Sequence, residues 1–315
     1  MMEYLLLIIG FVLIVKFSDI LVDAACSVAN NLKIPKIVIA LTVMAFGTCA
    51  PEIAISFKSI SAGNGSMALS NVVGSCIINV LMIIGLAAII SPIKVKNDTI
   101  NKEVPLLCLI TLIFSILVLD STLVSSMPNT ITRFDGIILL LLFMIFVFYL
   151  YNIVKEHKNK NRSKPKYGMV KSIILVIISI FVVAKASDLI VDNAVIIANN
   201  LGVSHKIITM IIIVIGTSLP ELTMTVRSAK KHEFDIALGN IIGTNIFNIC
   251  IVLGLPLTIY GDVPISDFGI IDFVILFTST VVLYIFAKTD KKLNKSEGIV
   301  MFLIFVCYYA YILLV

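Results

Sequence analysis

Residues 43–57 read VMAFGTCAPEIAISF, a run apolar enough to lie in a lipid bilayer that nevertheless carries one carboxylate, Glu52. A charged side chain at the centre of a bilayer costs at least about 2.5–3.5 kcal/mol, so such residues are rare and mark functional sites. Pro51 precedes the glutamate, and proline cannot donate to the carbonyl four residues earlier, which belongs to Gly47. We therefore expect the helix to bend or break beside Glu52, with freed backbone carbonyls that face a site.

The same pattern returns 169 residues later along the chain. Three stretches recur at this offset without gaps: GTCAPE (47–52) as GTSLPE (216–221), ALSNVVGSCIIN (68–79) as ALGNIIGTNIFN (237–248), and SDILVDAACSVANNL (18–32) as SDLIVDNAVIIANNL (187–201). Generic hydrophobicity does not reproduce Asn, Pro, Glu and Gly at a fixed offset. The two halves of the chain are therefore copies of each other.

Lipid is the expected solvent for most of this chain. Of its 315 residues, 59% are hydrophobic and 14% are charged, whereas a soluble domain carries about 25% charged residues. Ten apolar runs are long enough to cross a bilayer as helices: 4–25, 36–60, 67–91, 104–120, 134–154, 169–192, 206–228, 235–259, 267–287 and 297–314. The sequence thus predicts an all-α polytopic membrane protein with ten transmembrane helices.

Each copy holds five of these helices, and an odd number forces the second copy to enter the membrane upside down. We expect a first five-helix repeat at 1–154, with its motif region at 36–91. A second five-helix repeat at 169–315 has its motif region at 205–259. The fold is then a pair of inverted repeats, joined by the linker 155–168.

The linker carries six basic residues: Lys155, Lys158, Lys160, Arg162, Lys164 and Lys166. Basic loops stay in the cytoplasm, which places the linker there. Counting outward over ten helices puts the other basic loops on the same side and both termini outside. We expect a multi-pass protein of the cell membrane, without affinity for nucleic acid.

Glu52 and Glu221 fall midway along equivalent helices, where two ionised carboxylates would repel each other. A cation between them removes this repulsion, and no intramembrane Lys or Arg is placed to pair with both. The nearby ligand types are hydroxyl, amide and carbonyl oxygens, which suit Ca²⁺ or Na⁺. The histidines needed for zinc or copper lie in or beside polar connections: His157, His205 and His232.

Polar residues spaced four apart share one face of the third helix and of the eighth. They are Asn71, Ser75 and Asn79 in the first repeat and Asn240, Thr244 and Asn248 in the second. Such residues either bind the cation or join helices by hydrogen bonds. We favour cation ligands for Ser75, Asn79, Thr244 and Asn248, and both roles stay open for Asn71 and Asn240.

Four further carboxylates lie toward the ends of the first and sixth helices: Asp19, Asp23, Asp188 and Asp192. Carboxylates are ordinary at a membrane interface, so we expect these to be structural or peripheral to an ion pathway. The six cysteines form no C-x-x-C pair, and we expect free thiols.

GTCAPE and GTSLPE, each followed by a helix with an N-x-x-G-[ST] segment, resemble the two alpha-repeats of the cation/calcium antiporter superfamily. The resemblance covers nearly the whole chain and is strongest to the prokaryotic sodium/calcium exchangers. It implies a calcium site made by Glu52 and Glu221 with carbonyls of Thr48 and Thr217. It implies flanking sodium sites from these residues: Ser75, Ser218, Thr244, Asn79, Asn248, and the backbone near Ala45 and Val214.

Two positions depart from that family pattern. Cys49 stands where close relatives have serine, and a thiol is a poor sodium ligand, so the sodium site on its side is weakened or relies on carbonyls. Asn248 stands where relatives often have aspartate, which limits the pocket to two negative charges. Two charges match one Ca²⁺ and argue against a potassium-cotransporting exchanger.

The resemblance further implies exchange of three Na⁺ for one Ca²⁺ by alternating access, with the first and sixth helices sliding against the other eight. Proton/calcium exchange, with Glu52 and Glu221 protonated on the return step, is the main alternative. An intramembrane hydrolase using Ser218 or Cys49 would need a nearby base that the histidines do not supply. A passive channel is the last alternative. We expect no enzymatic activity, no cofactor, and a monomer whose partners are Ca²⁺, Na⁺ and lipid.

Overall fold

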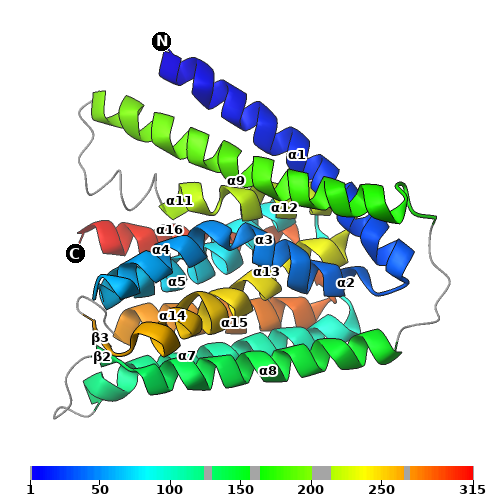
Figure 1. Cartoon of the computed structure of the whole chain (residues 1–315). Helices are drawn as coiled ribbons and strands as arrows, with labels where there is room; N and C mark the ends of the chain where they lie inside the picture. Colours follow the sequence, from blue (N-terminus) through cyan, green and yellow to red (C-terminus); the bar gives the residue numbers. More distant parts are fainter. Residues whose placement is uncertain (1, 124–129, 157–163, 201–213, 266–269, 315) are drawn as a thin grey trace.

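The structure, a computed structural model, describes residues 2–123, 130–156, 164–200, 214–265 and 270–314 (Figure 1). Nearly all of these residues are helical. Within them, eight helices are long and apolar enough to cross a membrane, and a bent helix pair can form a ninth span. The remaining predicted span, 206–228, lies partly in 201–213, outside the described residues.

The first half begins with the long helix α1 (Met2–Leu32). The other helices of this half are α2 (Lys36–Ile39), α3 (Ala45–Thr48), α4 (Ala50–Ser61), α5 (Gly65–Ile77), α6 (Gly85–Ile90), α7 (Val104–Leu123) and α8 (Arg133–Glu156). Three π-helical segments continue them: η1 (Ala40–Met44), η2 (Ile78–Ile84) and η3 (Thr99–Glu103). The side chain of Asn64 caps α5 by accepting a hydrogen bond from the backbone N–H of Met67 at 3.0 Å.

The second half begins with α9 (Met169–Asn200). It continues through α11 (Val214–Thr217), α12 (Leu219–Lys230), α13 (Phe234–Phe247), the π-helical η5 (Asn248–Leu253), α14 (Gly254–Tyr260), α15 (Ile270–Thr289) and α16 (Lys295–Leu314). The helices α4 and α12 have 12 residues each and begin 169 positions apart, at Ala50 and Leu219. The duplication seen in the sequence therefore recurs in the element boundaries.

Four two-residue strands pair across the halves. They are β1 (Ile93–Lys94), β2 (Thr130–Ile131), β3 (Val263–Pro264) and β4 (Lys292–Leu293). β1 pairs antiparallel with β4, and β2 pairs antiparallel with β3. Each pair joins one strand of the first half to one of the second. The two pairs are thus equivalent under exchange of the halves.

Two close helix crossings show the same exchange. A Cβ added at Gly298 would lie 2.6 Å from the carbonyl oxygen of Gly85, and one added at Gly136 would lie 2.8 Å from that of Gly254. Gly85 and Gly254 are 169 positions apart in the chain. Backbones approach this closely only where neither residue carries a side chain.

The predicted break beside Pro51 is confirmed in the first half. The segment Lys36–Thr48 and the helix Ala50–Ser61 meet at an angle of 51°. Cys49 lies at the junction, and Pro51 falls in the first turn of α4, where a missing N–H removes no helical hydrogen bond. In the second half, Ser218 separates α11 from α12 in the same way, with Pro220 in the first turn.

The long helices α1 and α9 lie side by side and cross one side of the bundle obliquely (Figure 1). Both expose many large apolar side chains, as expected for surfaces that face lipid. The spans Gly65–Ile90 and Phe234–Tyr260 are instead 78% and 94% buried within their most apolar windows. These two spans form the centre of the molecule, and the broken helices pack against them.

Candidate cation site

Glu52 and Glu221 are the central pair of buried carboxylates. Each side chain is 1% exposed and lies in the first turn of its helix, α4 or α12, immediately after the break. The two carboxylates are close enough to interact electrostatically. The N-terminus of a helix favours negative charge, so the breaks help to hold carboxylates at this depth.

Three of the four carboxylate oxygens lack a hydrogen-bond partner among the described residues. Oε2 of Glu52 and both oxygens of Glu221 are buried without a hydrogen-bond partner among the described residues. No Lys or Arg of these residues pairs with either side chain, although many other acidic residues do form ion pairs. Buried carboxylates with few hydrogen bonds and no counter-ion are costly, so the site needs a cation or protons.

The first broken helix contacts α13 directly. The hydroxyl of Thr48 donates to the carbonyl oxygen of Ala45 at 3.2 Å and lies 3.4 Å from the hydroxyl of Thr244. The thiol of Cys49 is buried and contacts the carbonyl oxygen of Thr244 at 3.8 Å. These contacts bring Thr48, Cys49 and Thr244 together.

Two predicted serines lie buried beside the breaks. Ser218 is the junction residue of α11 and α12, and Ser75 lies on α5, which packs against α4 and α11. Neither hydroxyl oxygen has a partner among the described residues. Thr217 ends α11 directly before Ser218 and is half-buried. The hydroxyls at Ser75 and Ser218 are therefore available to a bound ion.

The predicted amides occupy equivalent positions where regular helix gives way to π-helix. Asn79 lies in η2, and Asn248 begins η5, which packs against α4. Oδ1 of Asn79 and both polar atoms of Asn248 are buried without a hydrogen-bond partner in the described part of the chain. π-Helical segments often mark functional sites because they displace side chains from the regular helical register.

Asn245 is a polar residue of this region that the sequence did not single out. It accepts a hydrogen bond from Nδ2 of Asn79 at 2.9 Å and donates one to the carbonyl oxygen of Cys76 at 3.2 Å. The equivalent position in the first half is Cys76. Because an apolar thiol there matches no amide, the comparison of the two halves did not mark Asn245 as a site residue. Asn245 acts here by orienting Asn79.

Asn71 makes the hydrogen bonds of a structural residue. Its Nδ2 donates to the carbonyl oxygen of Glu52 at 3.1 Å and to the hydroxyl of Ser56 at 3.2 Å. The role left open for Asn71 is thus interhelical bonding between α5 and α4. Asn240, its counterpart, is buried without such bonds.

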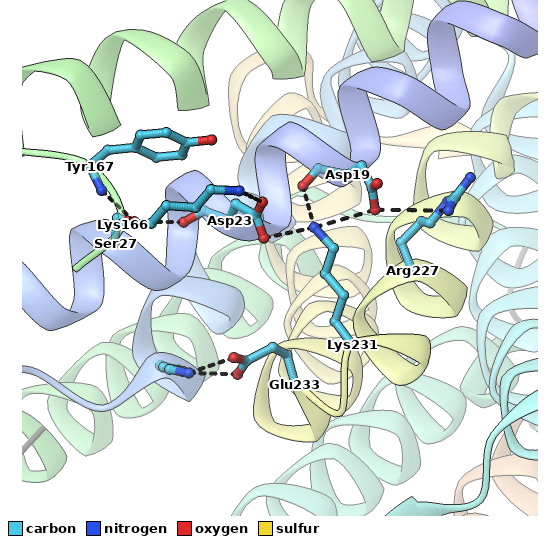
Figure 2. A network of polar contacts seen from close by, with 9 residues as sticks. Asp19, Asp23, Ser27, Lys166, Tyr167, Arg227, Lys231 and Glu233 are labelled. Carbon is cyan, nitrogen blue, oxygen red and sulfur yellow. Dashed lines mark hydrogen bonds and ion pairs between the residues drawn. The ribbon is translucent and has the colours of Figure 1, made fainter. Parts of the chain in front are cut away.

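A network of ion pairs ties α1 to the end of α12 (Figure 2). Nζ of Lys231 lies 2.7 Å from Oδ1 of Asp23 and 3.3 Å from Oδ1 of Asp19, and Arg227 approaches Asp19 at 3.9 Å. Lys166 donates to Asp23 at 2.6 Å, and this hydrogen bond raises the pKa of the lysine. These contacts fit the structural role expected for the two aspartates.

The equivalent acids of α9 are paired differently. Asp188 contacts Lys185 of the same helix at 3.0 Å. Lys231 corresponds to Ala62 in the first half. The ion pairs that join Lys231 to Asp19 and Asp23 therefore have no equivalent there. The network is therefore specific to one end of the molecule.

The features that often mark a metal or ligand site do not coincide with the two glutamates. No group of three or more His, Cys, Asp or Glu side chains suited to a metal ion occurs in the described parts of the chain. A cavity of about 740 Å³ is lined by Lys36, Glu103, Tyr149 and Glu233, among others, and by neither Glu52 nor Glu221. A cation at the central pair would thus depend on two carboxylates and neutral oxygens.

The chain is similar in sequence and in fold to known membrane proteins, among them sodium/calcium exchangers. The family model described as sodium/calcium exchanger protein matches residues 2–152 and 171–314. The inner membrane protein YrbG of Escherichia coli is 35% identical over 80% of this chain and 78% of its own length. The sodium/calcium exchanger MaX1 of Methanosarcina acetivorans is 27% identical over 97% of both chains.

Solved structures agree with the sequence relatives. The sodium-calcium exchanger NCX_Mj, soaked with Na⁺ and Ca²⁺, superposes with a TM-score of 0.83 over 98% of both chains at 30% identity. The same protein soaked without either ion gives the same TM-score.

Proposed function

Because this chain belongs to the sodium/calcium exchanger family, we propose that it exchanges Na⁺ for Ca²⁺ across the cell membrane by alternating access. The observation that carries this proposal is the pair of buried carboxylates, Glu52 and Glu221, three of whose four oxygens lack a hydrogen-bond partner among the described residues. One Ca²⁺ neutralises two carboxylates. It also accepts the six to eight oxygen ligands that hydroxyls, amides and freed carbonyls would complete.

The assignment of the ions follows the resemblance to the prokaryotic sodium/calcium exchangers. Calcium would lie between Glu52 and Glu221, with backbone oxygens of Thr48 and Thr217. Sodium would occupy the flanking oxygens, from these residues: Ser75, Ser218, Thr244, Asn79, Asn248 and the backbone beside Cys49. The empty, doubly negative site would resist closure because closing it buries unpaired charges. Only loaded states would then cross, which couples the two fluxes.

Three Na⁺ per Ca²⁺ would move one net charge in each cycle. Such a charge is worth about 2.3 kcal/mol per 100 mV of membrane potential. An inward sodium gradient and an inside-negative potential would thus drive calcium out of the cell.

The proposed topology is ten helices in two inverted five-helix repeats, with the 155–168 linker in the cytoplasm. In Figure 1 the N-terminal end of α1 and the C-terminal end of α16 lie toward one side, while α8 ends toward the other. This arrangement supports both termini on the side opposite to the linker. The basic residues of the linker support the cytoplasmic assignment.

Proton/calcium exchange is the second candidate, and one observation favours it. Neither Glu52 nor Glu221 has a basic partner among the described residues, so protons could neutralise both carboxylates on the return step. Residue 248 is an asparagine, whose amide does not ionise. Its side chain therefore does not distinguish sodium exchange from proton exchange.

Calcium uptake into proteoliposomes separates the two candidates. We expect ⁴⁵Ca uptake when internal sodium is diluted into a sodium-free medium, with no uptake driven by a pH gradient at equal sodium. Uptake that follows the pH gradient and ignores sodium would replace sodium exchange by proton exchange.

A further inference from the structure

A second group of buried, unpartnered polar side chains lies along α12, beyond Glu221. Thr225 is 0% and Ser228 is 1% exposed, and neither hydroxyl oxygen has a hydrogen-bond partner among the described residues. They follow Glu221 by four and seven positions, so all three side chains share one face of the helix. This face continues from the carboxylate pair toward the Lys230 end of α12.

Asn240 lies on α13, which packs against α12. Its side chain is 1% exposed, and neither Oδ1 nor Nδ2 has a partner in the described part of the chain. In the first half the equivalent residue, Asn71, donates to the hydroxyl of Ser56, which is the counterpart of Thr225. By this equivalence Asn240 lies opposite Thr225, but without the hydrogen bond.

The two halves therefore differ in the hydrogen bonding of these equivalent side chains. In the first half, Asn71 satisfies Ser56 and the carbonyl oxygen of Glu52, so polar groups of the protein close this face of α4. In the second half, four polar atoms of Thr225, Ser228 and Asn240 have no hydrogen-bond partner among the described residues. Buried polar atoms are nearly always paired with protein or with ordered water, so these need an occupant.

The opposite face of α12 holds the basic side chains. Thr223 on that face accepts a hydrogen bond from Ser18 of α1 at 2.9 Å, and Lys231 is held by Asp19 and Asp23. The face with Thr225 and Ser228 is thus free of positive charge. Together with Oδ1 of Asn240 on α13, it offers three neutral oxygens, which suit a monovalent cation and do not compensate the charge of a divalent one.

We propose that Thr225, Ser228 and Asn240 form a transit site for Na⁺ between Glu221 and the Lys230 end of α12. This inference rests on the proposed exchange function and adds a step to it. The site has no counterpart at Ser56 and Asn71, so sodium reaches the carboxylate pair by unlike routes from the two sides of the membrane.

Transport with matched serine variants tests the site. Ser228→Ala removes one ligand, whereas Ser59→Ala makes the same change 169 positions earlier, in the half that lacks the site. We expect Ser228→Ala and Thr225→Val to raise the half-saturating sodium about 2- to 10-fold, the effect of one lost polar contact. The rise should occur only for sodium applied at the Lys230 end of α12, with the half-saturating calcium unchanged. Ser59→Ala should change neither. The transit site would be overturned if Ser228→Ala and Ser59→Ala changed the half-saturating sodium concentration equally, or if neither changed it.

Anomalous diffraction with Tl⁺, a heavy monovalent cation, locates the ion directly in crystals of the full chain. We expect a peak among Thr225, Ser228 and Asn240 in addition to peaks near the glutamates. Peaks near the glutamates alone, or only ordered water beside Asn240, would overturn the transit site and leave the exchange function standing. A peak beside Asn71 would overturn the asymmetry, and the absence of any peak near the glutamates would overturn both proposals.

Discussion

The side-chain amide of Asn245 donates to the backbone carbonyl of Cys76 at 3.2 Å, and these two residues are equivalents, 169 positions apart. The thiol of Cys76 in turn contacts the carbonyl oxygen of Asn245 at 3.9 Å. Equivalent residues of two copies contact each other reciprocally when they lie beside the two-fold axis that relates the copies. The reciprocal contact therefore supports the proposed inverted repeats, in which Glu52 and Glu221 are equivalents.

Asn245→Leu should destabilise the protein because it removes both hydrogen bonds of the amide. The carbonyl oxygen of Cys76 and Nδ2 of Asn79 would be left buried without partners. Each such group costs about 1–3 kcal/mol, so we expect a clear drop in the thermal unfolding temperature in detergent. Equal unfolding temperatures for wild type and Asn245→Leu would contradict this role.

Gly298→Ala should weaken the crossing of α16 and α6. The added Cβ would lie 2.6 Å from the carbonyl oxygen of Gly85, a backbone atom that can move only with its helix. Overpacking of this kind costs about 1–3 kcal/mol. Gly168→Ala is the control, because a Cβ there meets no atom within 4 Å. Thermal unfolding of the two variants checks the prediction, and a neutral Gly298→Ala would show that the helices can separate freely.

Cys49→Ser should strengthen sodium binding on the first-half side of the site. The buried thiol contacts the carbonyl oxygen of Thr244, and serine would place a hard oxygen there. We expect the half-saturating sodium to fall about 2- to 10-fold, the value of one polar contact. Cys108→Ser, on α7, is the control. Unchanged sodium dependence in Cys49→Ser would exclude this side chain as a ligand.

Asn248→Asp should make exchange dependent on an additional cation. Asn248 is fully buried with both polar atoms unpaired, so a third carboxylate would leave one charge uncompensated by Ca²⁺. A buried unpaired charge is strongly unfavourable. We expect low ⁴⁵Ca uptake in potassium-free medium, with recovery when K⁺ is added. Wild-type uptake should not respond to K⁺, and full activity of the variant without it would contradict the two-charge site.

Lys231→Met should alter the transport rate more than the stability. Lys231 joins α12 to Asp19 and Asp23 of α1, but partly exposed pairs of this kind contribute only about 0–1 kcal/mol. If α1 slides during the cycle, loss of these ion pairs changes the turnover rate. The calcium concentration that gives half-maximal transport should stay unchanged. Lys185→Met is the matched control, since Lys185 pairs only within α9. A changed calcium dependence with unchanged turnover would contradict a role in α1 movement.

Much of the fold could be predicted from the sequence because lipid restricts the chain to helices and the duplication fixes their equivalence. The break at Pro51 followed from the missing N–H, and the burial of Glu52 and Glu221 followed from their place in apolar helices. Nine of the predicted spans have counterparts in the structure, if the bent pair is counted as one.

Contacts between the two halves of the chain could not be predicted. The role of Asn245 depends on its closeness to Cys76, which no spacing along the chain reveals. Asn71 and Asn240 look alike in sequence, yet only Asn71 is satisfied by its neighbours. Lys231, a shared partner of Asp19 and Asp23, likewise lies about 200 positions away in the chain.

The most direct test of the shared carboxylate site is sodium-driven ⁴⁵Ca uptake by Glu52→Gln and Glu221→Gln in proteoliposomes. Glu103→Gln is the control, because Glu103 is also buried but accepts a hydrogen bond from Tyr149 outside the site. We predict loss of exchange in both site variants and retained exchange in the control. Calcium exchange that survives in Glu52→Gln or Glu221→Gln would contradict a cation held between the two carboxylates.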